Sequence, residues 1–273
     1  MRILLTNDDG FHAEGFACLR AIAAQLSDDV WVAAPEVEQS GASRALTLSK
    51  PIAVQKKAPR EWMIAGTPTD CVLLAVQDLI EGPKPDLILS GVNRGQNLAE
   101  DVTFSGTVAG ALQGMAMGVP SIALSQAMLV YHDDLTALFE TALAHGPGLI
   151  RQLVEVGWAE KTVLNINFPD APPEAVTQVE VTKQGFRDQL HMHAEKRSDL
   201  RGRDYYWMGF KGQAGSPPQG TDLAAVYGGR ISVTPLHTDL SHMETVHRLK
   251  GLVGGAPPTL DASSTTALGR KAG

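Results

Sequence analysis

The sequence predicts a Rossmann-like, doubly wound α/β protein: a three-layer α/β/α fold with a mostly parallel sheet. Two observations support this. Short apolar runs alternate with segments of helical period along most of the 273 residues. Oxygen-bearing side chains and glycines also follow two of these runs, at the place where open α/β sheets bind ligands. We expect one α/β domain over residues 1–250, with an extended arm at about 184–220, and a disordered tail over 251–273.

The first ten residues carry the strongest local signal. Ile3 to Leu5 form an apolar run typical of a strand buried on both faces, and Asn7, Asp8 and Asp9 are poor strand formers. The strand should therefore end at about Thr6, with Gly10 allowing a sharp turn. Such a turn can bring both carboxylates to one cation, or it can leave them as solvated turn residues.

A helix over about 13–26 and a strand over 30–34 complete a βαβ unit. No Gly-x-Gly-x-x-Gly follows the first strand and no Walker-type motif occurs, so dinucleotide and P-loop interpretations lose support. The polar connection 36–49 begins just beyond the second strand and can reach the acidic turn. Within it, Ser40 is either a neutral metal ligand or a turn residue, and Arg44 either binds a phosphate or is solvated.

Strand-like runs at 52–54 and 62–65 precede a well-marked helix start. Thr67 has the position of an N-cap, Pro68 that of the first helical residue, and Asp70 completes the capping-box spacing. Apolar residues at helical spacing follow, so this helix should be well buried. We interpret the motif as a cap rather than as a catalytic group.

The pattern of the first strand is repeated at residues 86–89. This run leads into a loop in which the Asn93 carbonyl is either a neutral ligand for a hard cation or a turn residue. A second glycine-flanked stretch, Ser105-Gly106-Thr107, opens a helix to about Met117. Its N-terminus suits a phosphate, although a plain Ser/Thr cap explains the sequence as well.

The remaining elements extend the alternation. We expect strands at 120–124, 162–167, 179–181 and 231–233, a short helix at 222–227, and a helix from Asp133 or Asp134 that bends or breaks at 145–148. The segment 184–220 is polar but contains Tyr205-Tyr206-Trp207, which an arm or hairpin packed on another subunit would explain. His191 and His193 lie two residues apart without Cys or a helical Glu motif, a spacing that disfavours a zinc site.

Composition excludes several classes of partner. A formal charge of −7 gives no basic footprint for a nucleic-acid polymer. No apolar run reaches membrane-spanning length, and the N-terminus has no signal-peptide pattern, so we expect no membrane partner. Cys18 and Cys71 each lie in an apolar helical pattern and are interpreted as reduced core thiols. A cytoplasmic location follows as the expectation.

Several motifs, in this order, resemble the SurE family of stationary-phase survival proteins over about residues 1–240. They are Asn7-Asp8-Asp9-Gly10, Ala34-Pro35, Ser40-Gly41, Gly66-Thr67-Pro68-Thr69-Asp70-Cys71, Ser90-Gly91-Val92-Asn93-Arg94-Gly95, Ser105-Gly106-Thr107-Val108 and Ser232-Val233-Thr234-Pro235-Leu236. The resemblance implies a Rossmann-like core, a divalent metal and 5′-nucleotidase activity. For some members it also implies hydrolysis of short polyphosphate, and we keep 3′-nucleotides as further substrates.

The resemblance implies a set of site residues. One divalent ion per subunit, Mg²⁺ or Mn²⁺, is held by Asp8, Asp9, Ser40 and Asn93, and the first two are catalytic. The expected phosphate- and substrate-binding residues are Asn7, Gly41, Arg44, Asn93, Asn97, Ser105, Gly106 and Thr107. Self-association to a homodimer or homotetramer through the arm is also implied. Gln113 replaces an acidic residue expected at that position, and the chain beyond about Lys250 has no counterpart in the resemblance.

An all-oxygen donor set of this kind suits Mg²⁺ or Mn²⁺. The expected reaction is in-line attack by a metal-bound water on a nucleoside monophosphate, with Asp8 or Asp9 orienting the water. An aspartyl-phosphate intermediate is the mechanistic alternative. A nucleotide- or phosphate-sensing module without turnover would use the same loops. Two carboxylates aimed at an anionic ligand need a metal between them, which favours the enzyme.

Overall fold

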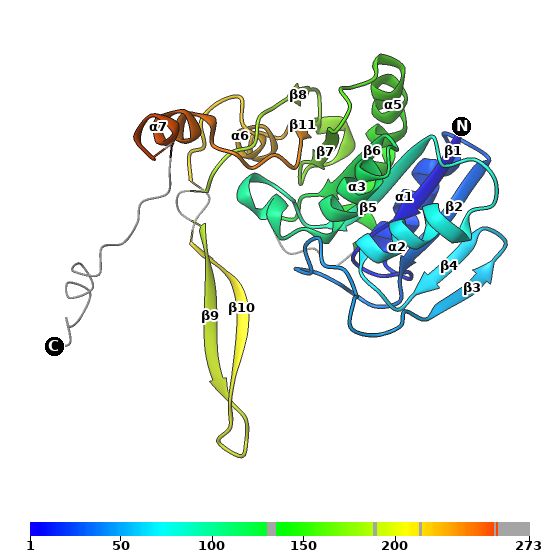
Figure 1. Ribbon diagram of the computed structural model, residues 1–273, viewed down its shortest axis with the longest axis horizontal. Coiled ribbons are helices and arrows are strands. Elements are labelled where there is room, and N and C mark those ends of the chain that lie inside the picture. The colour runs from blue at the N-terminus through cyan, green and yellow to red at the C-terminus, as the bar shows by residue number, and fades with distance from the viewer. Residues whose placement is uncertain (130–134, 188–189, 213–214, 254, 256–273) are drawn as a thin grey trace. The chain divides into compact units, whose positions relative to one another are not determined.

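The computed structural model describes residues 1–129, 135–187, 190–212, 215–253 and 255. In them a nine-stranded sheet runs in the order β3-β4-β2-β1-β5-β6-β7-β11-β8, and helices cover both of its faces (Figure 1). The chain divides into two compact units, residues 1–238 and 239–273. The predicted class, a Rossmann-like fold with a mostly parallel sheet, is confirmed.

The elements alternate as expected along the chain. The first half contains β1 (Arg2–Thr6), α1 (Glu14–Ala24), β2 (Asp29–Pro35), β3 (Val54–Ala58), β4 (Glu61–Ile64), α2 (Pro68–Leu74), the π-helix η1 (Ala75–Leu79), β5 (Leu87–Arg94), the 3₁₀ turn η2 (Ala99–Thr103) and α3 (Gly106–Ala116). The second half contains β6 (Ser121–Gln126), α4 (Leu135–Leu138), α5 (Glu140–Val156), β7 (Val163–Phe168), η3 (Pro173–Ala175), β8 (Val179–Val181), β9 (Leu190–Ser198), β10 (Asp204–Gly212), α6 (Asp222–Tyr227), β11 (Ile231–Leu236) and α7 (Met243–Val253).

The central strands share one direction. β1 pairs in parallel with β2 and β5, so Leu5 lies beside Val32 on one side and Leu89 on the other. Only β3, against β4, and β11, against β7, pair antiparallel in the described sheet. The carboxyl ends of β1, β2 and β5 therefore meet at one edge, which is where the polar motifs of the sequence lie.

Alternating side chains of the sheet supply two cores. Ile3 and Leu5 pack with Phe16 of α1 and with residues of α5 on one face, and Leu4 packs with Trp31 and residues of α2 on the other. β1 is buried on both faces, which explains why it is a continuous apolar run rather than an alternating one. The two cores fix the sheet edge from both sides.

Four expected boundaries are wrong. The strand expected at 52–54 lies at Val54–Ala58 instead, because it is an exposed edge strand whose Gln and Lys residues give no apolar signal. β5 continues past residue 89 to Arg94, since Asn93 pairs with Ser125 of β6 after a register shift. β11 likewise runs beyond residue 233, to Leu236, because its last residues pair with β7.

The fourth error concerns the break expected at 145–148. It does not occur, since α5 continues through Pro147. Gly146, Pro147 and Leu149 are all buried, and a Cβ on Gly146 would lie 3.1 Å from Ile22. Packing against α1 keeps the helix continuous where local propensity predicts a break. The expected helix start at Asp133 or Asp134 lies outside the described residues.

The predicted arm contains an antiparallel hairpin, β9 with β10, in which Tyr206 lies opposite Lys196 and Trp207 opposite Glu195. The side chains of Tyr205, Tyr206 and Trp207 are exposed. The described residues contain no group of three or more His, Cys, Asp or Glu side chains able to hold a metal, so His193 belongs to none. α7 was not predicted, and it ends at Val253, beyond residue 250.

Three glycines set the distance between α3 and the sheet. Gly106, Gly110 and Gly114 recur every four residues, so they lie on one face of the helix. A Cβ on Gly106 would lie 2.7 Å from Cβ of Asp8, and one on Gly110 would lie 2.8 Å from Oγ of Ser90. One on Gly114 would meet Oγ of Ser121 and lie 2.6 Å from Cδ1 of Ile88. The sheet therefore approaches the helix more closely than any side chain would permit.

We expect Gly114→Ala to lower the free energy of unfolding by about 1–3 kcal/mol, because the added methyl overpacks the contact with β5 and β6. Chemical denaturation of the purified variant measures this. Gly148→Ala is the matched control: Gly148 is also helical, and nothing lies within 4 Å of an added Cβ. This control should gain about 0.5–1 kcal/mol from helix propensity. Equal effects of the two changes would contradict the close packing of α3.

Candidate active site

The acidic turn after β1 is held in place by a hydrogen bond within the turn and by one to the end of β2. Nδ2 of Asn7 donates to the Gly10 carbonyl at 2.8 Å, and the N–H of Phe11 donates to the Pro35 carbonyl at 2.7 Å. Gly10 has a φ of +104°, in the region that favours glycine. The predicted end of the strand at Thr6 is confirmed, and the turn places two successive carboxylates at the sheet edge.

Asp8 is buried against the N-terminus of α3. Its Oδ1 accepts a hydrogen bond from the Thr107 hydroxyl, and the N–H groups of Gly106 and Thr107 also stabilise the carboxylate. Desolvation outweighs these donors and raises the pKa of Asp8 above its ordinary value. The close approach of Gly106 described above makes this contact possible.

Asp9 accepts a hydrogen bond at 3.0 Å from the backbone N–H of Arg94, the last residue of β5. The pKa of Asp9 is raised to about 7, mainly by desolvation and then by repulsion from Asp8, with a smaller contribution from Glu38. The hydrogen bond from Arg94 and the charge of Arg94 act in the opposite direction. Ionising both carboxylates at this site is therefore costly in the absence of a cation.

The loop that carries Ser40 lies against the acidic turn, because the N–H of Gln39 donates to the Asp8 carbonyl at 2.7 Å. The Ser40 hydroxyl is exposed and donates to Glu38 at 2.8 Å. Glu38 is a carboxylate near Asp9 that we did not predict. Its signal was available in the sequence, two residues before Ser40, in the loop already expected to reach the turn.

The capping box predicted at Thr67 and Asp70 is confirmed, and it also anchors this loop. Oδ1 and Oδ2 of Asp70 accept from the N–H and hydroxyl of Thr47 at 3.1 and 2.7 Å, and the Thr67 hydroxyl donates to the Ala45 carbonyl at 2.8 Å. A local cap thereby positions the segment on which Ser40 lies.

Asn93 is half-buried near the end of β5. Its Nδ2 donates to the Gly95 carbonyl at 2.8 Å, so the amide oxygen is the atom left for a ligand. The next residue in the chain bonds to Asp9. The structure thus brings the segments of Asp8, Asp9, Ser40 and Asn93 to one edge of the sheet.

The predicted phosphate-binding residues have different environments. Ser105 is the N-cap of α3 and accepts from the Val108 N–H at 3.0 Å, as expected of a cap, while the Thr107 hydroxyl is engaged by Asp8. Gly41 is exposed, with a φ of +76°. Arg44 is exposed too, and it donates at 3.2 Å to Gln113, the position where an acidic residue was expected.

Asn97 belongs to a buried polar network beneath this edge. Its Nδ2 donates to the Ser125 hydroxyl at 2.8 Å, and its N–H donates to Oδ1 of Asn167 at 2.8 Å. Its carbonyl accepts from Asn165 and Asn167 at 2.9 and 3.1 Å. In this structure the side chain of Asn97 joins the loop after β5 to β6, and the backbone of Asn97 joins it to β7.

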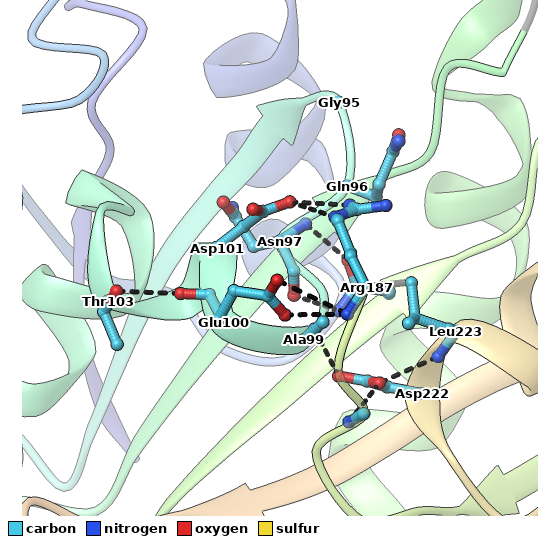
Figure 2. A network of polar contacts seen from close by, with 12 residues as sticks. Gly95, Gln96, Asn97, Ala99, Glu100, Asp101, Thr103, Arg187, Asp222 and Leu223 are labelled. Carbon is cyan, nitrogen blue, oxygen red and sulfur yellow. Dashed lines mark hydrogen bonds and ion pairs between the residues drawn. The ribbon is translucent and has the colours of Figure 1, made fainter. Parts of the chain in front are cut away.

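The turn η2, which leads into α3, is tied to the C-terminal part of the first unit (Figure 2). Arg187 donates to Asp101 at 2.8 and 2.6 Å, and its backbone N–H donates to Glu100. Asp222 accepts from the N–H groups of Ala99, Gly185 and Leu223, each at 2.8 Å. This network was not predicted, because no motif in the sequence links residues more than eighty positions apart.

The donors at the sheet edge fit a hard divalent cation. Within the described part of the chain no three carboxylate, His or Cys side chains form a metal-binding group, so further ligands to Asp8 and Asp9 would be neutral oxygens or water. Oδ1 of Asn7 is buried without a hydrogen-bond partner in the same turn. Oxygen ligands without sulfur or imidazole favour Mg²⁺ or Mn²⁺ over Zn²⁺.

A groove of about 830 Å³ lies elsewhere. It runs past Leu87, Pro120 and Thr162, which precede or begin β5, β6 and β7, and Trp158 lines it. These residues mark the amino-terminal edge of the sheet, opposite the acidic turn. Of the predicted site residues only Arg44 lines it, so the groove is not the candidate active site.

The family whose sequence model matches the chain is described as "Survival protein SurE", and the match covers residues 3–191. A protein of Caulobacter vibrioides named 5′-nucleotidase SurE is 67% identical over 94% of this chain and 98% of its own length. One of Hyphomonas neptunium with the same name is 51% identical over 92% of this chain and 98% of its own length.

The crystal structure of the SurE protein from Aquifex aeolicus superposes with a TM-score of 0.79 at 36% identity, covering 92% of this chain and 99% of that one. This chain is thus similar to these proteins in sequence and in fold over nearly its whole length. The chain belongs to the SurE family.

Proposed function

We propose that this protein is a 5′-nucleotidase that hydrolyses nucleoside 5′-monophosphates with the aid of one divalent cation. The observation that carries the proposal is the pair Asp8 and Asp9, two desolvated carboxylates with raised pKa values at the carboxyl edge of the sheet. Burial of two adjacent anions is costly unless a cation offsets their charge. The 5′-nucleotidase name of the relatives at 51% and 67% identity supports the same activity.

Asp8, Asp9, Ser40 and Asn93 would hold the cation, because their segments meet at this edge and offer two anionic and two neutral oxygens. When bound, Mg²⁺ or Mn²⁺ polarises a phosphate oxygen and lowers the pKa of water. The Ser40 hydroxyl would have to turn from Glu38, to which it donates at 2.8 Å. The Asn93 amide is already oriented by its bond to Gly95.

The residues of the chain itself supply positioning. Thr107 holds one oxygen of Asp8, and the Arg94 N–H holds one oxygen of Asp9, so each carboxylate keeps a fixed orientation. The N-terminus of α3 places positive dipole beside the reacting phosphate. Asp8 or Asp9 would be the base that orients the attacking water, since burial raises the pKa of both carboxylates, that of Asp9 to about 7.

The proposal extends to 3′-nucleotides and short polyphosphate as further substrates, because a metal and a helix N-terminus recognise the phosphate rather than the rest of the molecule. Phosphate release from a panel of nucleoside 5′- and 3′-monophosphates and tripolyphosphate, with Mg²⁺, with Mn²⁺ and with chelator, tests it. Release from at least one 5′-monophosphate that chelator abolishes is the expected result. Nucleotide binding without release would indicate a sensing module instead.

Self-association through the hairpin belongs to the proposal. Tyr205, Tyr206, Trp207 and Met208 of β10 are between 42% and 66% exposed, an apolar run that a second subunit would cover. A homodimer or homotetramer is the expected assembly. We also propose a cytoplasmic location, for which the free, buried thiols Cys18 and Cys71 are the expected state. No described helix is long and apolar enough to cross a membrane.

Asp8→Asn and Asp9→Asn should each reduce metal-dependent phosphate release by at least about a thousandfold, because each removes one of two anions that hold the cation. Release of phosphate from AMP, assayed over a range of Mn²⁺ concentrations, measures the loss. Circular dichroism should show the wild-type fold in both variants. Asp28→Asn, an exposed carboxylate outside the site, is the matched control and should keep full activity. Wild-type turnover by either site variant would refute the assignment.

In metal-free protein, the contribution of Asp9 to stability should fall as the pH rises toward 7. The pKa of Asp9 is raised to about 7 in the folded state, so the folded chain binds more protons than the unfolded chain between about pH 4 and 7. The contribution of Asp9 to the free energy of unfolding therefore falls across this window, and the full penalty is present above pH 7. Asp9→Asn removes the penalty and should stabilise the chelated protein by about 2–4 kcal/mol at pH 8, but little at pH 4.

Denaturant titrations with chelator at the two pH values measure this difference, again with Asp28→Asn as the control. A stabilisation of equal size at pH 4 and pH 8 would show that the charge of Asp9 is not its cause. Added Mn²⁺ should reverse the order at pH 8, because only the wild type gains the binding free energy of the cation.

Replacing Tyr206 and Trp207 together by Ser should give a smaller species in light scattering after gel filtration, since the exposed surface of β10 is lost. Leu252→Ser, which changes an exposed residue of α7 in the second unit, serves as the control. A wild-type protein that is monomeric at micromolar concentration would rule out the assembly.

A further inference from the structure

One exposed aromatic residue directly precedes the start of α3, the helix that contacts Asp8. Among the described residues, the exposed Phe, Tyr and Trp side chains are Phe104, Phe186, Tyr205, Tyr206 and Trp207. The last four lie in the hairpin or shortly before it. Phe104 is 49% exposed, although the four residues that follow it are buried. The phosphate chemistry proposed above makes no use of an apolar ring at this position.

Phe104 is close to the acidic turn along the backbone. It is the C-cap of η2, and the next residue, Ser105, is the N-cap of α3. Gly106 approaches Asp8 so closely that a Cβ there would lie 2.7 Å from Cβ of Asp8. Two Cα–Cα steps of about 3.8 Å separate Phe104 from Gly106. A nucleobase lies one pentose away from its 5′-phosphate, which is a separation of the same scale.

The backbone of Phe104 joins the two loops of the site. Its carbonyl accepts from the Ser43 N–H at 3.1 Å, and the Thr103 carbonyl accepts from the Ser43 hydroxyl at 2.7 Å. Its own N–H donates to the Asp101 carbonyl at 2.9 Å. Phe104 therefore lies where the loop of Ser40 meets the start of α3.

The network in Figure 2 holds this position rigid. The backbone carbonyl of Asp101 accepts a hydrogen bond from the Phe104 N–H. The carboxylate of Asp101 is held by Arg187, whose side chain is 5% exposed. The Thr103 hydroxyl donates to the Glu100 carbonyl at 2.8 Å, and Asp222 holds the N–H of Ala99. A ring on a pre-ordered backbone binds a flat ligand with little loss of conformational entropy.

We infer that Phe104 is the surface on which the nucleobase of the substrate stacks. The inference rests on the proposed nucleotidase function and deepens it. A phenyl face attracts any base through its π-system and apolar area, without reading hydrogen-bond donors or acceptors. Phe104 thus favours nucleotides over phosphomonoesters that lack a base, and it favours purines, with their larger rings, over pyrimidines.

The test compares AMP with ribose 5-phosphate, which carries the same phosphate and sugar without the base. Phe104→Ala should lower kcat/KM for AMP by about 10- to 100-fold, mainly through KM, while that for ribose 5-phosphate stays within about twofold of wild type. Phe104→Trp should retain or improve the value for AMP. Phe186→Ala makes the same truncation at a 75% exposed Phe and should change neither substrate.

Equal loss on both substrates would overturn the inference, since it would show that Phe104 holds the phosphate cradle rather than the base. Unchanged AMP kinetics in Phe104→Ala would overturn it as well. If the wild type hydrolyses neither substrate with Mn²⁺, the proposed nucleotidase fails first. Calorimetric titration of wild type and Phe104→Ala with AMP then tests the stacking surface without turnover, and equal affinities would reject it.

Discussion

The contact between Asp8 and the start of α3 is the constraint on which the site depends. The Asp8 carboxylate, just after β1, accepts a hydrogen bond from the Thr107 hydroxyl. Gly106 has no side chain, so the helix can approach Asp8 this closely. The approach continues along the helix at Gly110 and Gly114, where a side chain would meet β5 and β6. A wider helix face would move the N-terminus of α3 away from the sheet edge. The geometry of the site is thus set in part by the close packing of the helix on the sheet up to two turns away.

The same contact explains why the site is costly in the absence of a cation. The helix N-terminus and Thr107 stabilise the charge on Asp8, but burial raises its pKa nonetheless. Asp9 then lies beside a first carboxylate with one backbone donor, from Arg94. The donors at the site do not offset the burial of either carboxylate, and repulsion between the two carboxylates adds to the cost at Asp9. A divalent cation would relieve both effects.

Local signals in the sequence were sufficient for much of the architecture. The end of β1 at Thr6, the capping box of Thr67 and Asp70 and the Ser105 cap follow from residues within four positions of one another, and the structure has all three. The segments of the predicted metal ligands meet because carboxyl ends of parallel strands share an edge. The identity of the ligands and the phosphate-binding roles stay predictions, since they depend on side-chain orientations that a bound ion would decide.

What sequence could not supply depends on distant contacts. Pro147 is helical because Gly146 packs on Ile22, and Asn93 belongs to a strand because Ser125 lies beside it. The Arg187 and Asp222 network likewise joins η2 to segments near the other end of the first unit. Such contacts have no local signature, yet they decide how rigid the turn before α3 is. The residues that perform the proposed chemistry were therefore easier to find than the residues that hold them in place. Reactive residues belong to a few residue types in recognisable motifs. The residues that position them are of ordinary types and act only through their surroundings in the fold.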